Sequence, residues 1–225
     1  MHWVCHGVIN SDNTSKSARP PLSKITSSIQ CKDIHSLLAI MSALHSPLIN
    51  SVVQFWFEEI DSSCWFEQND SFDAMLRDRF AELHRQACHG ELFGWRDTAL
   101  GRLAEILILD QFSRNLYRHQ PQAFAFDGMA LVLAQAAITA GAPAQLTLDQ
   151  RRFLYMPFMH SESLAIHDIA LHLFSEPGME FNLDYEQQHR AIIARFGRYP
   201  HRNQVLGRHS SAEELAFLAE PGSSF

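Results

Sequence analysis

The sequence lacks most of the patterns by which common membrane proteins and enzymes are identified. No uninterrupted apolar run approaches the ~18 residues of a membrane-spanning helix, so no transmembrane segment is predicted. The 4 cysteines form no CxxC pair and have no zinc-ligand spacing, a pattern typical of reduced thiols in a cytoplasmic protein. There is no GxSxG, no P-loop and no GxGxxG after a strand. The sequence therefore gives no motif for a serine hydrolase or a nucleotide-binding enzyme.

Positive charge is also in short supply. The 225 residues carry 18 Lys and Arg against 25 Asp and Glu, a formal net charge of −7. This balance disfavours general binding to nucleic acid or to an anionic membrane, so we expect neither as a partner. Hydrophobic residues make up 46% of the chain and charged residues 19%, which is ordinary for a globular protein with a sizeable core.

The chain divides into a tail and a body. Residues 1–45 are rich in serine and contain scattered apolar residues, which is typical of a flexible extension. Met41 stands just before the well-patterned part and is a candidate second start site. We expect residues 46–225 to form a single domain.

Strand signals are almost absent from the body, and helix signals are frequent. Alternating runs and Asn-Gly or Asp-Gly hairpins are missing, whereas apolar residues recur at steps of three and four. The expected helices are a short one after Ser51, then about 70–89, 98–118, 127–140, 148–156, 162–174, 184–196 and one after Ser210. Thr147 with Gln150 and Ser210 with Glu213 read as capping boxes, and Pro157 is expected to break or kink its helix. Because the connections are short, we predict an all-α fold of antiparallel helical hairpins.

The helix predicted over 98–118 places charge where its apolar stripe should continue. Leu100, Leu103 and Leu107 lie on one face of this helix, and further steps of three and four residues reach Asp110, Arg114 and Arg118. A second face of the helix is also apolar. Buried charges are costly unless paired. Two interpretations stay open: a structural salt-bridge network, or a polar pocket lined by Asp110, Gln111, Arg114, Asn115 and Arg118.

A histidine and a carboxylate lie together at the next turn. His160 and Glu162 follow a proline-containing helix, at a position where scaffolds often place functional side chains. A histidine beside a carboxylate can act as a general base with an orienting partner. Ordinary first-turn residues of a helix would give the same pattern.

A third group of polar residues lies between 187 and 209. This segment holds 5 arginines and no acid. The guanidinium group of arginine can donate two parallel hydrogen bonds to a carboxylate or a phosphate group. The segment therefore indicates either an anion site or solvated surface arginines. On the preceding helix, His189 shares a face with apolar residues and should point inward. The candidate residues here are His189, Arg195, Arg198, His201, Arg202 and Asn203.

His167, Asp168 and His172 are the nearest approach to a metal-binding pattern. Their spacing does not form HExxH or a paired-histidine motif. We therefore predict no metal and no cofactor.

Long ordered blocks of the sequence resemble a known family. They include LDQFSRNLYR at 109–118, FLYMPFMHSE at 153–162, RFGRYPHRN at 195–203 and the ending FLAEPGSSF at 217–225. Together with the aromatic start at 55–57, these blocks resemble the bacterial domain-of-unknown-function 924 family over about residues 50–225. The resemblance implies a helical fold similar to tetratricopeptide-repeat proteins and implies no established activity. Ser113 and Tyr199 depart from the proline and phenylalanine common in that family.

Three functions remain open on this sequence. The first is a pocket that binds a small anionic metabolite or a carboxylate group through Arg, His and Asn side chains. The second is an enzyme in the same pocket, with His160 or His201 as acid/base group and Glu162 or Asp110 as its orienting carboxylate. The third is a helical protein-interaction scaffold, whose partner the sequence does not identify.

Overall fold

A computed structural model describes residues 46–223 of the chain. The predicted N-terminal extension and the candidate start at Met41 lie outside these residues. The described residues belong to one compact unit, Met41–Phe225. They form helices and connecting turns with no strand among residues 46–223, so the all-α prediction is confirmed. A regular tetratricopeptide geometry stays a prediction.

The helices follow one another through short turns. Residues 46–54 are helical and continue into a π-helical turn, Phe55–Glu59. The α-helices after it are α2 (Asp70–Cys88), α3 (Ala99–Leu107), α4 (Ser113–Leu116), α5 (Asp127–Thr139), α6 (Leu148–Met159), α7 (Leu164–Leu173), α8 (Glu180–Phe196) and α9 (Ala212–Leu218). Short 3-10 turns separate several of them, among them η6 (Pro121–Phe124) before α5 and η8 (Pro200–Arg202) after α8.

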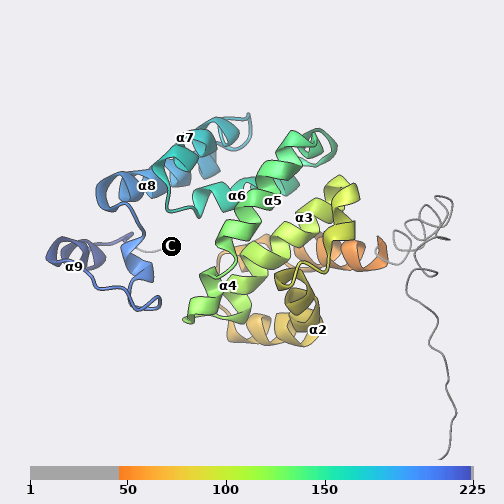
Figure 1. Cartoon of the computed structure of the whole chain (residues 1–225), viewed down its shortest axis with the longest axis horizontal. Coiled ribbons are helices and arrows are strands. Elements are labelled where there is room, and N and C mark those ends of the chain that lie inside the picture. The colour runs from red at the N-terminus through yellow and green to blue at the C-terminus, as the bar shows by residue number, and fades with distance from the viewer. Residues whose placement is uncertain (1–45, 224–225) are drawn as a thin grey trace, which may run out of the picture. The chain divides into compact units, whose positions relative to one another are not determined.

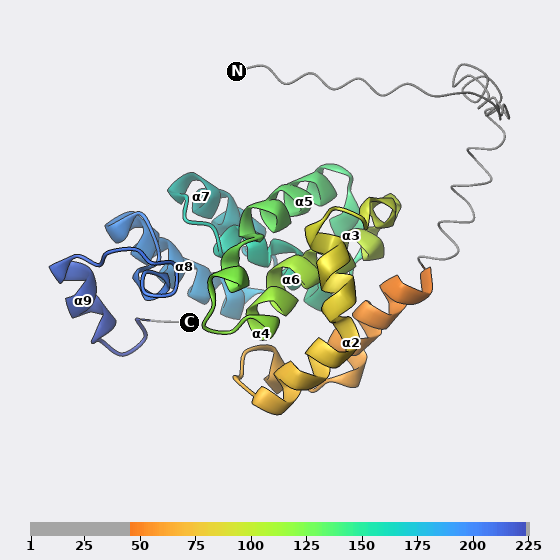
Figure 2. The ribbon, with the colours of Figure 1, turned by 60° about the horizontal axis from the view of Figure 1, so that its bottom comes forward.

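Successive helices pack against their neighbours in the chain and against one earlier helix. α5 packs on both α3 and α6, and α7 packs on α6 and α8. Figures 1 and 2 show α7, α8 and α9 at one end of the described residues and α2 near the other. The turn between α6 and α7 therefore lies beside the segment that follows α8.

Side-chain caps mark the starts of four of the eight helices from α2 to α9. Thr98 caps α3, and Thr147 with Gln150 forms the predicted capping box of α6. At the last helix the box is shifted by one residue, because Ser211 and Glu214, not Ser210 and Glu213, exchange the two hydrogen bonds. Asn69 caps α2 in the same way.

Two long helices differ from their predicted form. α6 continues through Pro157 to Met159. The helix expected over 98–118 is divided by a π-helical turn, η5 (Ile108–Phe112), between α3 and α4. A π turn inserts one extra residue and changes the phase of the side chains after it. This change of phase is not visible in apolar spacing, and it falls on Asp110 and Gln111, both buried.

The core is dominated by aromatic rings from the first and middle parts of the body. Phe153 of α6 lies with its ring centroid 4.9 Å from that of Trp65 and 5.5 Å from that of Trp56. Trp56 also meets Phe112 of η5, and the indole N–H of Trp65 donates to the Trp56 carbonyl oxygen at 2.9 Å. This cluster fixes α6 and η5 in position, and both carry residues of the candidate site.

One helical segment, Pro121–Thr139, is long and apolar enough to cross a membrane by length and composition, with a mean hydropathy of 1.3. The core helix of a globular protein passes the same test. The sequence shows no long apolar run here because Asp127 and Gln135 interrupt the apolar residues. In this fold its helical part, α5, packs on α3 and α6.

The aromatic cluster predicts a large effect of one truncation. Phe153→Ala removes a buried ring from the cluster, so we expect the free energy of unfolding to fall by about 3–5 kcal/mol in a denaturant titration. The matched control is Phe93→Ala, which removes a ring that is 60% exposed and should change stability little. Equal losses in the two variants would contradict this description of the core.

Candidate functional site

A cavity of about 300 Å³ lies between three segments of the chain. Its walls come from η6 and the start of α5, from the turn between α6 and α7, and from η8 with the residues after it. One part of the wall is apolar and consists of Pro121, Phe124, Ala125, Leu131 and Leu206. The polar part consists of Asp127, His160, Ser161, Glu162 and Arg202, beside the backbone of Gly128.

The start of α5 presents backbone donors near this cavity. Its N-cap is Phe126, which makes no side-chain capping hydrogen bond. The amide groups of a first helical turn lack partners inside the helix and attract negative charge. Asp127 occupies that first turn and lines the cavity.

His160 is held by a buried carboxylate. Its Nδ1 lies 2.7 Å from Oδ1 of Asp110, and Gln111 donates to the other carboxylate oxygen at 2.5 Å. Burial by itself raises the pKa of the Asp110 carboxyl, but the charge of Arg114 and the contact with His160 outweigh it and hold that pKa at about 2. Asp110 is therefore ionised and accepts the Nδ1–H of His160.

This contact fixes which nitrogen of His160 is available. Burial, with the charge of Arg114, lowers the pKa of His160 below its ordinary value, against the opposite effect of Asp110. The imidazole is neutral near pH 7, with its proton on Nδ1. Among the described residues no hydrogen-bond partner faces Nε2, and the side chain lines the cavity.

Arg114 connects two carboxylates. Its Nη1 donates to the Asp110 carbonyl oxygen at 2.6 Å and lies 3.2 Å from Oδ1 of the same residue. The two terminal nitrogens also donate to the two oxygens of Asp127, each at 3.1 Å. The i,i+4 ion pair predicted between Asp110 and Arg114 is thus present, and Asp127 completes it.

Arg202 is the least satisfied charged group of the cavity wall. It is 6% exposed, and its guanidinium lies over the rings of Tyr199 and Phe124, 4.5 and 4.7 Å from their centroids. It donates once, from Nη1 to Asp127 at 3.1 Å, while its buried Nε has no hydrogen-bond partner. A buried donor without a partner costs free energy, so the Nε–H of Arg202 is an uncompensated polar group in this structure.

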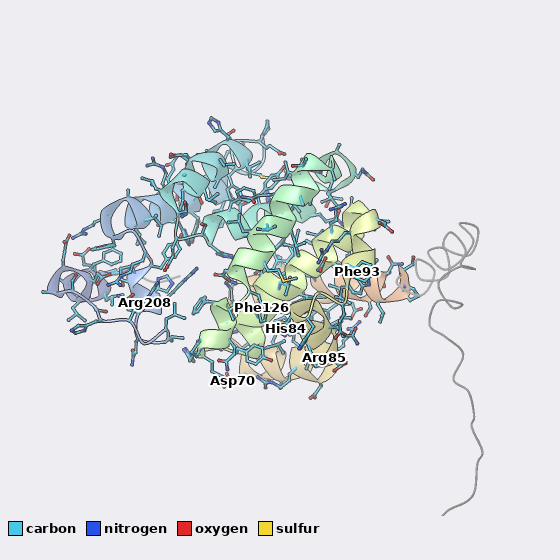
Figure 3. All side chains as sticks on the ribbon, in the orientation of Figure 1. Asp70, His84, Arg85, Phe93, Phe126 and Arg208 are labelled. Atoms are coloured by element: carbon cyan, nitrogen blue, oxygen red, sulfur yellow. The ribbon has the colours of Figure 1, made fainter. Side chains whose placement is uncertain are left out.

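The turn between α6 and α7 is tied to the segment after α8. Glu162 accepts two hydrogen bonds from Arg208, at 2.6 and 2.9 Å, and one from the Tyr199 backbone N–H. Figure 3 labels Arg208 between α8 and α9. Although burial raises the pKa of Glu162, the contact with Arg208 and the Tyr199 N–H hold it below its usual range. Glu162 is therefore an ionised, paired residue that holds Tyr199 in place.

A second histidine supports the same turn from inside the protein. The Nε2–H of His167 donates to the Ser161 carbonyl oxygen at 2.8 Å, and its Nδ1 lies 2.6 Å from Oε1 of Glu186. Both side chains are fully buried, and burial raises the pKa of Glu186. The Tyr199 hydroxyl donates to the Met159 carbonyl oxygen at 2.6 Å. These contacts fix the backbone on both sides of His160.

Four of the predicted site residues lie in ion pairs or networks away from the cavity wall. Arg118 pairs with Asp73 of α2 at 2.7 Å and also donates to Asn115. Arg195 pairs with Glu213, and Arg198 pairs with Glu214 of α9. Their role in this fold is to join helices.

The remaining predicted residues stand behind the wall. The Nδ1–H of His189 donates to the Tyr185 carbonyl oxygen at 2.8 Å, and burial lowers its pKa to about 3. His201 lies with its ring 5.4 Å from that of Tyr199, and burial with the charge of Arg202 lowers its pKa to about 4. Asn203 is fully buried and donates to the Ser210 hydroxyl at 3.1 Å. His160, rather than His201, therefore faces the cavity with a carboxylate behind it.

Sequence reasoning missed four residues that shape the site. The sequence places Asp127 only at the start of a predicted helix, and it assigns no role to Phe124, to Tyr199 or to Arg208, the partner of Glu162. The available signal was the position of Asp127 in the first turn of an otherwise uncharged helix. Its partners Arg114 and Arg202 lie 13 and 75 residues away along the chain, and sequence spacing does not reveal such contacts.

Comparisons with known proteins agree with the resemblance drawn from the sequence motifs. A family described as "Bacterial protein of unknown function (DUF924)" matches residues 52–222. A solved structure from Agrobacterium tumefaciens, titled as the protein of unknown function ATU0120, is similar at 36% identity and a TM-score of 0.74. The match covers 78% of this chain and 98% of that one. No curated protein matches the chain.

The buried Asp110 carboxylate predicts a pH-dependent loss of stability in one variant. Asp110→Asn removes the negative charge that both Arg114 and His160 contact. We therefore expect the free energy of unfolding near pH 7 to fall by about 3 kcal/mol. Because folding lowers the pKa of Asp110, its contribution is lost as the pH falls from 3.8 to about 2, and the difference between the two proteins should narrow over that interval.

The matched control for this variant is Asp168→Asn, which removes an exposed partner of Arg190. It should cost less than about 1 kcal/mol. Denaturant titrations at several pH values measure both quantities. A difference between wild type and Asp110→Asn that stays constant down to pH 2 would contradict the assignment of an ionised buried carboxylate.

Proposed function

We propose that this chain, which belongs to the bacterial DUF924 family of unknown function, binds a small anionic metabolite through its carboxylate or phosphate group. The single observation that carries the proposal is Arg202: a guanidinium buried between two aromatic rings, on a cavity wall, with Nε lacking a partner.

The contacts of Arg202 favour a role in ligand binding over a purely structural role. Stacking on Phe124 and Tyr199 keeps the guanidinium in one plane, so little conformational entropy is lost when a ligand binds. Asp127 engages one nitrogen only, because Arg114 already occupies both of its oxygens. The guanidinium of Arg202 therefore has further N–H groups that can donate to a planar acceptor such as a carboxylate.

Arg202→Gln tests the proposal directly. Removing a charge-assisted fork should weaken the binding of a small anion such as butyrate or phosphate by about 10-fold or more, measured by calorimetric titration. Arg202→Lys keeps the charge but loses the planar fork, and should weaken binding as well.

Arg195→Gln is the matched control, because Arg195 is an exposed arginine paired with Glu213 on the surface. It should bind the anions as the wild type does. Anion binding that survives in Arg202→Gln, or that Arg195→Gln removes, would contradict the proposal.

A second candidate function, an enzyme in the same cavity, is favoured by the Asp110–His160 contact at 2.7 Å. A neutral histidine oriented by an ionised carboxylate, with its other nitrogen toward a cavity, is suited to general-base catalysis. We expect an enzyme to convert a bound acid over time in an NMR assay of mixed carboxylic acids, and His160→Gln to abolish the conversion. Mixtures that stay unchanged with the wild type would argue for binding alone. The scaffold alternative would need an exposed apolar groove, and a small cavity with charged residues in its wall does not favour it.

A further inference from the structure

The charges around the cavity are balanced before any ligand binds. Three arginines and three carboxylates form the network: Arg114 with Asp110 and Asp127, Arg202 with Asp127, and Arg208 with Glu162. His160 is neutral. A bound anion therefore leaves one negative charge uncompensated beside the largely buried side chains of Arg202, Asp127 and His160, where such a charge is costly.

His160 is the group placed to restore the balance. Its Nδ1–H already donates to the Asp110 carboxylate, which stabilises an imidazolium as well as an imidazole. It is also the C-cap residue of α6, and the carboxyl end of a helix favours a positive charge. Its Nε2 has no hydrogen-bond partner among the described residues and is on the cavity side.

The other groups near His160 do not compete for this proton. Asp110 of η5, Asp127 of α5 and Glu162 are each paired with an arginine, and Arg114 and Arg202 are cations. His189 of α8 gives its Nδ1–H to the Tyr185 backbone, and burial holds its pKa at about 3. His160 thus remains the one proton acceptor of this set that has both a carboxylate partner and access to the cavity.

The cavity also limits the kind of anion. Its volume of about 300 Å³ is at the lower end for small-molecule sites. One wall is apolar, which suits a short hydrocarbon tail. One proton on His160 balances one negative charge, whereas a dianion would leave a second charge uncompensated.

We propose that the Arg202 cavity takes up a short monocarboxylate together with one proton, and that His160 holds the proton. The inference rests on the proposed function and specifies its ligand class. In the bound state the carboxylate accepts from the guanidinium of Arg202, its tail lies on the apolar wall, and His160 is an imidazolium paired with Asp110.

The test is a calorimetric titration of butyrate in buffers of different ionisation enthalpy, near pH 7. The dependence of the observed heat on buffer enthalpy gives the number of protons taken up, and we expect about one per butyrate for the wild type. Affinity should also fall as the pH rises, by up to about 10-fold per unit. Butyramide, which has the same tail without the charge, should not bind.

His160→Gln should bind butyrate without proton uptake. The matched control His172→Gln, which changes an exposed histidine of α7, should keep the uptake. A second measurement does not depend on a variant: NMR titration of the wild type should show the pKa of His160 raised by butyrate.

The outcomes separate the two proposals. If butyrate binds without proton uptake, or phosphate binds more tightly than butyrate, the inference is wrong and the anion-binding function stands. If His160→Gln keeps the full uptake, the assignment of the proton to His160 is wrong. If neither butyrate nor phosphate binds the wild type, both proposals fail.

Discussion

The site depends on Arg114, the half-buried arginine that joins Asp110 to Asp127. A carboxylate inside a protein is costly unless a cation and hydrogen bonds compensate it. Arg114 supplies the charge for both acids, at 3.2 Å from one and 3.1 Å from the other. Because Arg114 keeps Asp110 ionised, Asp110 can orient His160. Because Asp127 already pairs with Arg114, it accepts only one hydrogen bond from Arg202. One ion-pair network thus produces both the oriented histidine and the available guanidinium.

The surrounding helices and turns keep this ion-pair network in one conformation. The aromatic cluster around Phe153 positions α6, which ends at His160, and the π turn η5 carries Asp110 into the interior. Behind the turn, His167 and Tyr199 bind the backbone carbonyls of Ser161 and Met159. Glu162 and Arg208 then tie that turn to the segment that carries Arg202. Preorganisation of this kind reduces the entropy lost when a ligand binds.

Much of this arrangement could be predicted from the sequence, and the rest could not for identifiable reasons. The helices, the Thr147–Gln150 capping box and the inward charges of Asp110 and Arg114 follow from local periodicity and the cost of burial. The π turn at 108–112 could not be predicted, since i→i+5 bonding leaves no mark in apolar spacing. Regular helical spacing predicts Arg118 on the same face as Asp110 and Arg114. The π turn changes the phase of the side chains after it, and Arg118 pairs with Asp73 on α2. Asp127 and Arg202 are 75 residues apart, so only the folded chain brings them together.

The central claim is that the guanidinium of Arg202, on the wall of the cavity, binds the carboxylate of the ligand. The most direct measurement is an NMR spectrum of the arginine Nε–H groups of the wild type, with the Arg202 signal assigned by substitution, during titration with butyrate. We predict that the Arg202 signal moves progressively to the position of a carboxylate-bound guanidinium while that of the surface residue Arg195 stays in place. An unmoved Arg202 signal, with other arginines responding instead, would contradict the account.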